Sequence, residues 1–288
     1  MGSDLLTRLN NELKSFSKGQ RAIAKFILEN YDKAAFMTAG KLGKVVGVSE
    51  STVVRFAADL GYDGYPAMRK ALQEMIRNRL TSVQRIEVAK DRIDDKEIIK
   101  SVISSDMQNL QVTMDSLDQN CFDAAVNAIV EAKNVYIVGM RTSTSLASFL
   151  GLYLNLLRGN VTVINNTAAS EIHEQIIRIG EGDLFLGISY PRYSSHTVDA
   201  MHFAKSMGAK AIAITDSQAS PLAAIADISM FAKSEMVSFI DSLVAPMSLI
   251  NAIIIAVGRR NMDSVAKTFA KLENLWMEYD VYERPSQS

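Results

Sequence analysis

The hydrophobic periodicity of the chain changes near residue 134, and this change limits the possible folds more than any other feature. Up to about Leu80, apolar residues recur at helical spacing, and no segment has the pattern of a β-strand. From Asn134 onward, short apolar runs alternate with segments of helix length; the runs are Val135–Gly139, Val161–Ile164, Leu184–Ile188, Ala211–Ile214 and Ile228–Phe231. Such an alternation indicates a parallel sheet covered by helices on both faces. We therefore predict two domains, an all-α helical bundle and an α/β doubly wound, flavodoxin-like domain with five parallel strands.

Composition sets the expected domain limits. We expect a helical domain over residues 1–79 and the α/β domain over residues 96–284. Residues 80–95 are polar, mixed in charge and short of large side chains, so we interpret them as a linker, either helical or irregular.

Helices are expected before, between and after the strands of the second domain, among them one that carries His173 and one after Thr197 that carries His202. An amphipathic helix over 96–117 opens it, and Asn120 is expected to cap a helix over 122–132. Another helix, over 143–157, follows the first strand, and an apolar one is expected over 239–259. The first and last of these are candidate packing surfaces between subunits or, equally, parts of the core of one subunit.

The chain has the sequence features of a cytoplasmic protein. Its single cysteine, Cys121, excludes an internal disulfide and fits a reducing compartment. Residues 1–4 carry neither the basic nor the apolar part of a signal peptide. The most apolar late stretch, Ala245–Val257, contains Ser248 and Asn251 and is too short to span a bilayer, so no membrane partner is expected.

The net charge of −1 conceals an asymmetry along the chain. Residues 1–90 hold 15 Lys and Arg against 9 Asp and Glu, a net charge of +6. Residues 91–288 hold 16 against 23, a net charge of −7. A basic front joined to an acidic back indicates that the front is the part that meets a polyanion.

Capping residues divide the front into separate helices. A first helix is expected over Asp4–Phe16. Ser17 and Gln20 form a capping box for the second, and Thr38 and Ser49 can cap two more.

Residues 38–56 have the pattern of a short helix, a tight turn with one glycine, and a second helix whose first turn is small and polar. Small polar side chains at a helix N-terminus allow the helix to enter the major groove of DNA and to present hydroxyls and amides there. The residues predicted to contact DNA are Ser49, Glu50, Ser51, Thr52, Arg55, Lys41 and Lys44. Those expected to face the core are Val48, Val53, Phe56 and Leu60. The pattern alone also fits an ordinary three-helix bundle with a capped surface helix.

The basic residues of the first domain can contact either the bases or the phosphates of DNA. Arg55 can contact a guanine or a phosphate, and the phosphate contact is the commoner role. Further phosphate candidates, each of which can also be simply solvated, are Lys18, Arg21, Arg69 and Lys70.

Two loops that follow strands are rich in hydroxyls, at residues 139–145 and 189–197. Anions bind where strand ends meet helix N-termini, because free backbone amides and the helix dipole converge there. Serine and threonine can also be simple helix caps, but two such loops on one sheet edge favour a phosphate site.

The helix sequence SESTVVRF at 49–56, followed by LGYDGYP at 60–66, closely resembles the RpiR family of transcription regulators. Family members carry an S-x-S/A-T-V-x-R-F helix and an L-G-F/Y-x-G-Y/F turn, and join this helix-turn-helix to a sugar isomerase (SIS) domain. The resemblance covers essentially the whole chain. It implies a non-enzymatic regulator of sugar catabolism genes that binds double-stranded operator DNA and a sugar phosphate effector, without a cofactor, as a homodimer or homotetramer.

The SIS resemblance extends to the two hydroxyl-rich loops. Gly139 and Ser143 fit a G-x-G-x-S phosphosugar loop, with Arg141 at the second glycine. Ser189 and Ser194 fit an S-x-S-G-x-T/S loop in which Pro191 and Arg192 replace Ser and Gly. Glu235 is similar in position to an acidic residue of a later ligand loop, as an acceptor for sugar hydroxyls. The implied effector-binding residues are Arg141, Thr142, Ser143, Ser145, Ser189, Arg192, Ser194, Ser195 and Glu235.

The two arginines are departures from the SIS pattern. The planar guanidinium suits phosphate or carboxylate, so our hypothesis is that Arg141, Arg192 or both bind the anionic group of the effector, or a second anionic group. Equally, either can point to solvent or pair with an acid across a dimer contact.

Two other functions fit parts of the sequence. One is a phosphosugar isomerase with an accessory helical domain, since SIS enzymes use Glu and His as base and acid. Glu171 precedes His173, which could reach a pocket across a subunit boundary; His196 lies in the second loop, and His202 is expected to be structural. The other is a protein-interaction role for the front bundle. We favour the regulator, because the recognition-helix resemblance is the tighter one; no residues have metal-ligand or Ser-His-Asp spacing.

Overall fold

The structure is a computed structural model that describes residues 5–76, 81–90, 97–164, 169–236 and 239–283. The chain forms two compact units, one of Met1–Ser101 with Val237–Ile240 and one of Val102–Met236 with Asp241–Ser288. The first four residues, part of the expected linker and the tail at 285–288 lie outside the described residues.

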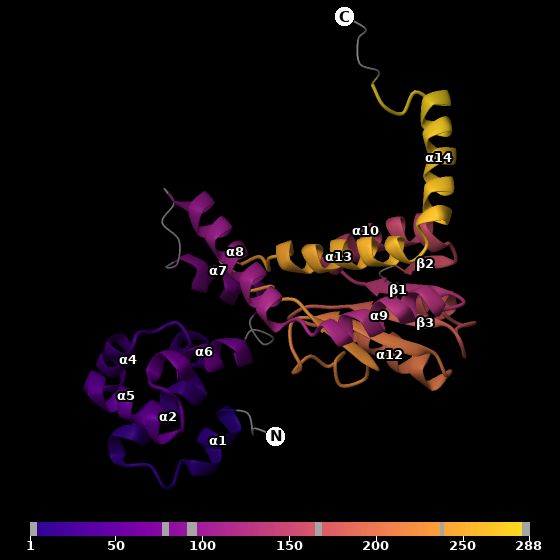
Figure 1. The fold of residues 1–288 in the computed structure, drawn as a ribbon. Coiled ribbons are helices and arrows are strands. Elements are labelled where there is room, and N and C mark those ends of the chain that lie inside the picture. The colour runs from indigo at the N-terminus through magenta and orange to yellow at the C-terminus, as the bar shows by residue number, and fades with distance from the viewer. Residues whose placement is uncertain (1–4, 77–80, 91–96, 165–168, 237–238, 284–288) are drawn as a thin grey trace, which may run out of the picture. The chain divides into compact units, whose positions relative to one another are not determined.

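Unit 1 is helical, as expected, and no strand occurs in its described residues (Figure 1). Its helices are α1 (Leu5–Glu12), α2 (Lys18–Glu29), α3 (Tyr31–Ala34), α4 (Ala39–Val46), α5 (Glu50–Asp59), α6 (Tyr65–Ile76) and α7 (Ser82–Lys90). α1 ends at Glu12 rather than Phe16, where the backbone and hydroxyl of Ser15 both donate to the Glu12 carbonyl. The short α3 was not predicted, and α7 lies within the expected linker.

The predicted caps of unit 1 are confirmed. Ser17 and Gln20 form the reciprocal capping box, with Gln20 N donating to Ser17 Oγ over 3.4 Å and Ser17 N donating to Gln20 Oε1 over 3.0 Å. Lys41 N donates to the Thr38 hydroxyl, and Thr52 N to the Ser49 hydroxyl. Each bond satisfies an amide that the helix leaves unpaired and fixes where the helix begins.

Unit 2 contains a five-stranded sheet in which every neighbouring pair is parallel, with the order β2-β1-β3-β4-β5. The strands are β1 (Val135–Gly139), β2 (Val161–Ile164), β3 (Leu184–Ile188), β4 (Lys210–Thr215) and β5 (Ile228–Phe231). Nearly all residues of β1, β3 and β4 are buried, because helices cover both faces of the sheet. The predicted doubly wound α/β fold is thus confirmed.

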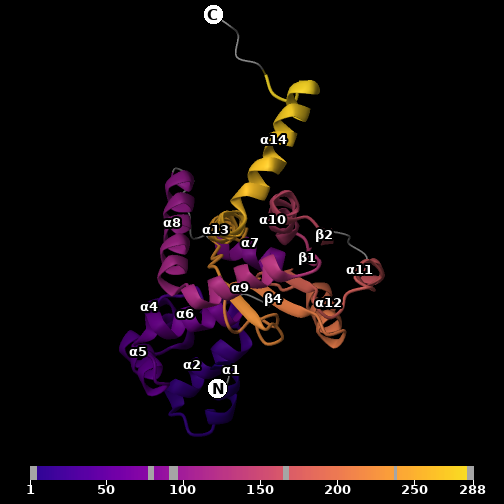
Figure 2. The same cartoon turned by 45° about the vertical axis from the view of Figure 1, so that its right-hand side comes forward.

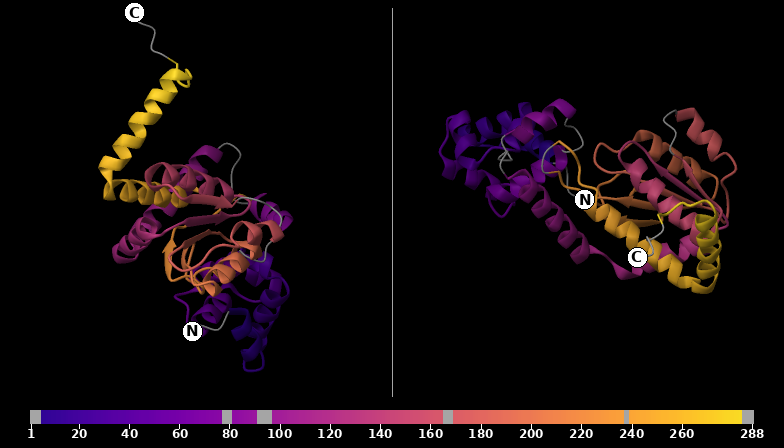
Figure 3. Two further views of the ribbon diagram at one scale, coloured as in Figure 1. Left: turned by 90° about the vertical axis from the view of Figure 1, so that its right-hand side faces the viewer. Right: turned by 90° about the horizontal axis from the view of Figure 1, so that it is seen from above.

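Each face of this sheet is covered by its own group of helices (Figures 2 and 3). One face packs on α9 (Gln119–Glu131), α10 (Ser143–Arg158) and α13 (Val244–Arg260). The other packs on α11 (Ala169–Gln175) and α12 (Ser195–Ser206). α8 (Ile98–Ser116) precedes these elements and α14 (Met262–Glu278) follows them.

Two expectations for these helices were wrong, and one helix was not predicted. α9 is capped by Asp118 rather than Asn120, because the Asp118 carboxylate reaches both the Asn120 and Cys121 amides. The late apolar helix begins at Val244 rather than Phe239. α14 was not predicted at all; Asn261 caps it by accepting from Ser264 N.

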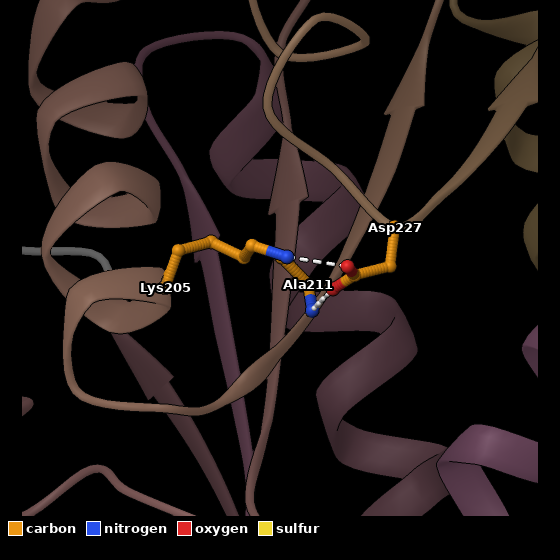
Figure 4. Close-up of polar contacts among 3 residues, drawn as sticks. All are labelled: Lys205, Ala211 and Asp227. Carbon is orange, nitrogen blue, oxygen red and sulfur yellow. Dashed lines mark hydrogen bonds and ion pairs between the residues drawn. The ribbon is translucent and has the colours of Figure 1, made fainter.

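A charged contact joins three elements at the amino-terminal ends of the strands (Figure 4). The Asp227 carboxylate, just before β5, accepts from Lys205 Nζ at the end of α12 and from Ala211 N in β4, the latter over 2.8 Å. Burial opposes ionisation of Asp227, but these two hydrogen bonds and the charges of Lys205 and Lys210 prevail and lower its pKa. The contact lies at the end of the sheet opposite the hydroxyl-rich loops.

Candidate DNA-reading and effector-binding sites

A tight turn joins α4 to α5 in unit 1. Gly47 adopts a left-handed conformation with φ 75°, and its N–H donates to the Gly43 carbonyl. Val48 N donates to the same carbonyl over 2.9 Å. A Cβ atom on Gly43 would lie 2.8 Å from the Val48 carbonyl oxygen, so only glycine permits this approach. The turn therefore depends on both glycines.

One face of α5 is held in the core of unit 1. Val53, Phe56 and Leu60 are buried, and the Phe56 ring meets Phe16 edge-on at 5.3 Å between ring centroids. Arg8 Nη2 donates to the Leu60 carbonyl over 2.9 Å, at the end of the helix. These contacts leave the opposite face of α5 to solvent.

Most of the predicted DNA contacts lie on that solvent face. The exposed residues are Ser49, Glu50, Ser51 and Arg55 on α5 and its cap, with Lys41 and Lys44 on α4. Thr52 was expected outside but is half-buried, and its hydroxyl lies 2.8 Å from that of Ser49. Val48 was expected in the core and is only half-buried.

Val54 is a surface residue that the sequence reasoning missed. Its side chain is 41% exposed, four positions after Glu50 and next to Arg55. Its exposure could have been predicted from its spacing. Val54 is apolar, but it does not lie on the helical face of the buried Val53, Phe56 and Leu60. An apolar side chain here can contact the methyl group of thymine.

The exposed Glu50 side chain also lies close to α4. Its carboxylate Oε2 lies 3.1 Å from the position of a Cβ atom on Gly40, in the first turn of α4. A carboxylate there is favoured by the positive end of the α4 dipole. Glu50 thus also contributes to the packing of α4 against α5.

In unit 2 the strand order reverses between β1 and β3, which are neighbours with Gly139 in register with Ile188. α10, which follows β1, and α12, which follows β3, lie on opposite faces of the sheet. In open α/β sheets this arrangement opens a crevice at the carboxyl ends of the strands, where ligands bind. The two hydroxyl-rich loops leave the sheet at this point.

The loop after β1 is held by close packing. A Cβ atom on Gly139 would lie 2.5 Å from the Ser143 carbonyl oxygen, so glycine is required where β1 meets α10. The Thr144 hydroxyl donates to the Gly139 carbonyl over 2.9 Å. Ser143 is buried, whereas the other site candidates of this loop are exposed: Arg141, Thr142 and Ser145.

The loop after β3 is held by its own side chains. The buried Ser189 accepts from Ser194 N at Oγ over 3.1 Å, and the Tyr193 hydroxyl donates to Asp216 Oδ1 over 2.7 Å. Ser194 is half-buried, and the other site candidates of this loop, Arg192 and Ser195, are exposed.

Thr197, in the first turn of α12, was not singled out from the sequence. It is fully buried, and its hydroxyl has no hydrogen-bond partner among the residues that the structure describes. Buried hydroxyls are nearly always paired with protein, water or a ligand.

Arg141 and Arg192 share an uncommon backbone conformation. Their φ angles are 56° and 64°, in the left-handed region that favours glycine. These are the two positions at which the resembling SIS loops carry glycine. The glycine-like backbone is therefore kept in both loops although the residue is arginine.

The exposed Glu235 lies on the segment after β5, the edge strand, and its backbone is held by α8. The buried Asn109 donates from Nδ2 to the Glu235 carbonyl over 3.1 Å and accepts from Glu235 N at Oδ1 over 3.2 Å. Thr113 accepts from Lys233 N over 2.8 Å, and Asp106 accepts from the Ser242 hydroxyl over 2.6 Å. We call this set of contacts the α8 clamp.

The remaining candidate residues are scattered. The His173 ring meets Phe203 of α12 edge-on at 5.5 Å, while His202, expected to be structural, is exposed. Cys121 lies 3.2 Å from the Ser229 carbonyl, measured from Sγ. Within the described ranges, no three His, Cys, Asp or Glu residues are grouped to hold a metal ion. None of the helices described here has the length and apolar character needed to cross a membrane.

Comparison with known proteins covers both units. Residues 3–79 match the helix-turn-helix domain of the rpiR family, and residues 128–256 match the SIS domain. The chain is 29% identical over 223 residues to the HTH-type transcriptional regulator HexR of Pseudomonas aeruginosa, covering 76% of this chain and 75% of HexR.

The solved structures that are similar to the chain include two of regulators. The sugar isomerase domain of an RpiR transcription factor from Sphaerobacter thermophilus is 30% identical with a TM-score of 0.60, covering 62% of this chain and 99% of that one. The Vibrio vulnificus NanR protein, in complex with ManNAc-6P, has the same fold, with 23% identity, a TM-score of 0.56, and coverage of 94% of this chain and 99% of NanR.

The turn between α4 and α5 yields a test by substitution. Gly43→Ala places a methyl group against the Val48 carbonyl, so we expect the free energy of unfolding to fall by about 1–3 kcal/mol. Gly19→Ala is the control, because its methyl group would meet Val48 Cγ1 at 3.5 Å and Thr52 Cγ2 at 3.6 Å, ordinary contact distances. Urea unfolding followed by circular dichroism measures both. Equal midpoints for Gly43→Ala and the unchanged chain would contradict the described turn.

Proposed function

Because the chain belongs to the RpiR family of helix-turn-helix proteins, we propose that it is a cytoplasmic transcription regulator of sugar catabolism genes whose operator affinity responds to a sugar phosphate. The observation that carries the proposal is the placement of two hydroxyl-rich loops at the β1–β3 switch point of a chain that also has a solvent-facing recognition helix. The role is regulatory rather than that of an isomerase, in keeping with the packing of His173 on Phe203.

α5 is the element that would enter the major groove. Its exposed first turn presents the small hydroxyls of Ser49 and Ser51, with Glu50 beside them, and Arg55 follows one turn later. Lys41 and Lys44 on α4 would contact phosphates, and the half-buried Thr52 would orient Ser49 through their shared hydroxyl contact. A homo-oligomer would present two such helices to the halves of a palindromic operator.

The DNA-reading role is tested with Arg55→Ala. We expect operator affinity to fall by about 5- to 150-fold, because a charged contact worth about 1–3 kcal/mol is lost. The operator is obtained by selection from random duplexes, and binding is measured by fluorescence anisotropy over a range of salt concentrations. Lys25→Ala is the control, since Lys25 is exposed on α2, outside the two DNA-reading helices.

The salt dependence distinguishes the two roles of Arg55. A phosphate contact predicts a salt slope reduced by about 1 and an equal loss on all sequences, whereas a guanine contact predicts lost discrimination at one position. Unchanged affinity of Arg55→Ala on the selected operator would remove Arg55 from the interface.

The effector would bind at the β1–β3 switch point. The hydroxyls of Ser143, Ser189 and Ser194 would contact the phosphate, with Thr142, Ser145 and Ser195 at the rim. Ser194 makes no side-chain capping bond to its helix, which leaves first-turn amides of α12 for an anion. In α10 the amides of residues 143–145 donate to the carbonyls of residues 140–142. ManNAc-6P, found with the NanR of the same fold, is one sugar phosphate to test.

Arg141 and Arg192 would bind anionic groups of the effector. A left-handed conformation costs a non-glycine residue about 1–2 kcal/mol, and arginine at these two loop positions supports a role for the side chains. Two guanidinium groups beside a phosphate site fit an effector with a second negative group, such as a carboxylate. Glu235, on the segment after β5, would accept from sugar hydroxyls.

Substitution of both arginines by glycine tests this role without disturbing the backbone. We expect the Arg141→Gly, Arg192→Gly protein to melt at the same or a higher temperature, since glycine is relaxed at positive φ. Affinity for the effector is expected to fall by roughly tenfold or more, as a charge-assisted contact is worth about 1.5–3 kcal/mol. Isothermal titration uses the phosphosugar that gives the largest thermal shift with the unchanged chain.

Arg259→Ala, at an exposed position near the end of α13, is the control for loss of positive charge. Full effector affinity in the double glycine variant would exclude the arginines from the site. Absence of any thermal shift with phosphosugars and their acids would instead overturn the effector site as a whole.

The α8 clamp offers a route from the effector site to DNA. α8 is the first helix after α7, so it lies on the covalent path between the DNA-reading helices and unit 2. Through Asn109 it is bonded to the backbone of Glu235, an effector-binding candidate. An effector that moves this segment would therefore move α8, and its effect on DNA affinity equals its differential affinity for the two arrangements.

Asn109→Ala tests this route. We expect operator affinity without effector and effector affinity itself to change little, while the change in operator affinity caused by effector is largely lost. Gln111→Ala is the control, because Gln111 is exposed on α8 and its side chain bonds Asp115 of the same helix. The measurement is anisotropy of operator DNA with and without saturating effector. A full response in Asn109→Ala would show that the clamp does not carry the signal.

A further inference from the structure

α14 is a long helix without a core of its own. It has 17 residues, none of them buried, and within unit 2 it contacts α10 and α13. In Figures 1 and 3 its C-terminal half stands clear of the sheet and of the other helices of this unit. A single helix of this length is marginally stable in water unless an apolar face is covered.

That apolar face has the spacing of a coiled-coil seam. Apolar and aromatic residues recur at alternating intervals of three and four, a heptad pattern; they are Met262, Val265, Phe269, Leu272, Trp276 and Tyr279. The two ends of this seam are open, with Met262 61% and Tyr279 72% exposed. The middle four residues are half-buried. The seam is therefore only partly covered by its own chain.

The chain after α14 folds back onto the end of the seam. Asp280 adopts a left-handed conformation with φ 48°, and Val281 N donates to the Trp276 carbonyl over 2.9 Å. The Tyr282 ring then meets Trp276 edge-on at 5.3 Å. This turn fixes the aromatic end of the helix rather than leaving it to fray.

The charges of α14 and the following turn are distributed unequally along its length. Residues 262–271 carry two lysines and one aspartate, a net charge of +1, and residues 272–283 carry four acids and no basic residue, a net charge of −4. A second copy in antiparallel orientation places the basic half of one helix beside the acidic half of the other, whereas a parallel copy places the acidic halves together. The acidic end also disfavours nucleic acid as an occupant.

We propose that α14 is a subunit interface that packs antiparallel against α14 of a second copy, seam to seam, and crosses it between Phe269 and Leu272. In this arrangement Met262 meets the partner's Tyr279, Phe269 meets the partner's Leu272, and Val265 meets the partner's Trp276. The same surface serves both copies, as a two-fold interface requires. The interface is independent of the effector site and of the recognition helix.

The first test measures association of the full chain by sedimentation velocity over a wide range of concentration. We expect a reversible dimer whose dissociation constant rises by roughly a hundredfold or more in Leu272→Glu, which places a charge in the apolar seam. Met277→Glu is the matched control, because Met277 is an apolar residue of the same helix, 59% exposed and off the seam. Trp276, the only tryptophan, reports dissociation by a red shift of its fluorescence on dilution.

The second test determines orientation and does not depend on Leu272→Glu folding. In a Cys121→Ser background, Leu272→Cys near the crossing point is expected to form a disulfide-linked dimer, while Tyr279→Cys at the helix end is not, because antiparallel packing separates the two ends. Equal cross-linking at both positions would indicate a parallel pair and overturn the proposal. So would a monomer at all concentrations, or a Leu272→Glu protein that associates as tightly as the unchanged chain.

Discussion

Unit 2 is organised by the close approach of α10 to the first two strands. A Cβ atom on Gly151 would lie 2.0 Å from Val163 Cγ2, and one on Gly139 would lie 2.5 Å from the Ser143 carbonyl oxygen. Gly151 is needed because the Val163 side chain lies where a Cβ atom would be, and Gly139 is needed because the backbone of α10 lies there. This packing sets where α10 begins, and so where Ser143 meets the end of β1. The geometry of the proposed effector site thus depends on two glycines, which have no side chain to contact a ligand.

The parts of the fold that could be predicted are those in which local chemistry and global packing agree. Strands such as Leu184–Ile188 are apolar throughout because both their faces are covered, and this pattern is visible in the sequence. Ser17, Thr38 and Ser49 cap helices through bonds that span three residues, so spacing alone reveals them. The two hydroxyl-rich loops could also be predicted, because each follows a strand that is recognisable in the sequence.

Other features depend on contacts distant in sequence and could not be read from spacing. Asn109 is bonded to Glu235, 126 positions away, and in the sequence it is one polar residue of an amphipathic helix. Val54 was not among the predicted surface residues, although its helical phase puts it on the outer face. α14 was not predicted, although its heptad pattern of apolar residues is regular. The left-handed Arg141 and Arg192 are visible only in the backbone.

The two proposed anion sites work by different physics because the units differ in charge. Residues 1–90 carry a net charge of +6, so their long-range field attracts a polyanion before any specific contact forms. Residues 91–288 carry −7, so their field repels DNA, and an anion can be held there only by groups within hydrogen-bond reach. At physiological salt charges are screened beyond about 8 Å, which lets a small phosphate enter where backbone amides, hydroxyls and two arginines are concentrated. The acidic charge of residues 91–288 therefore repels DNA but scarcely affects a small phosphate. In this way the chain directs its two negatively charged ligands to different units without a steric barrier.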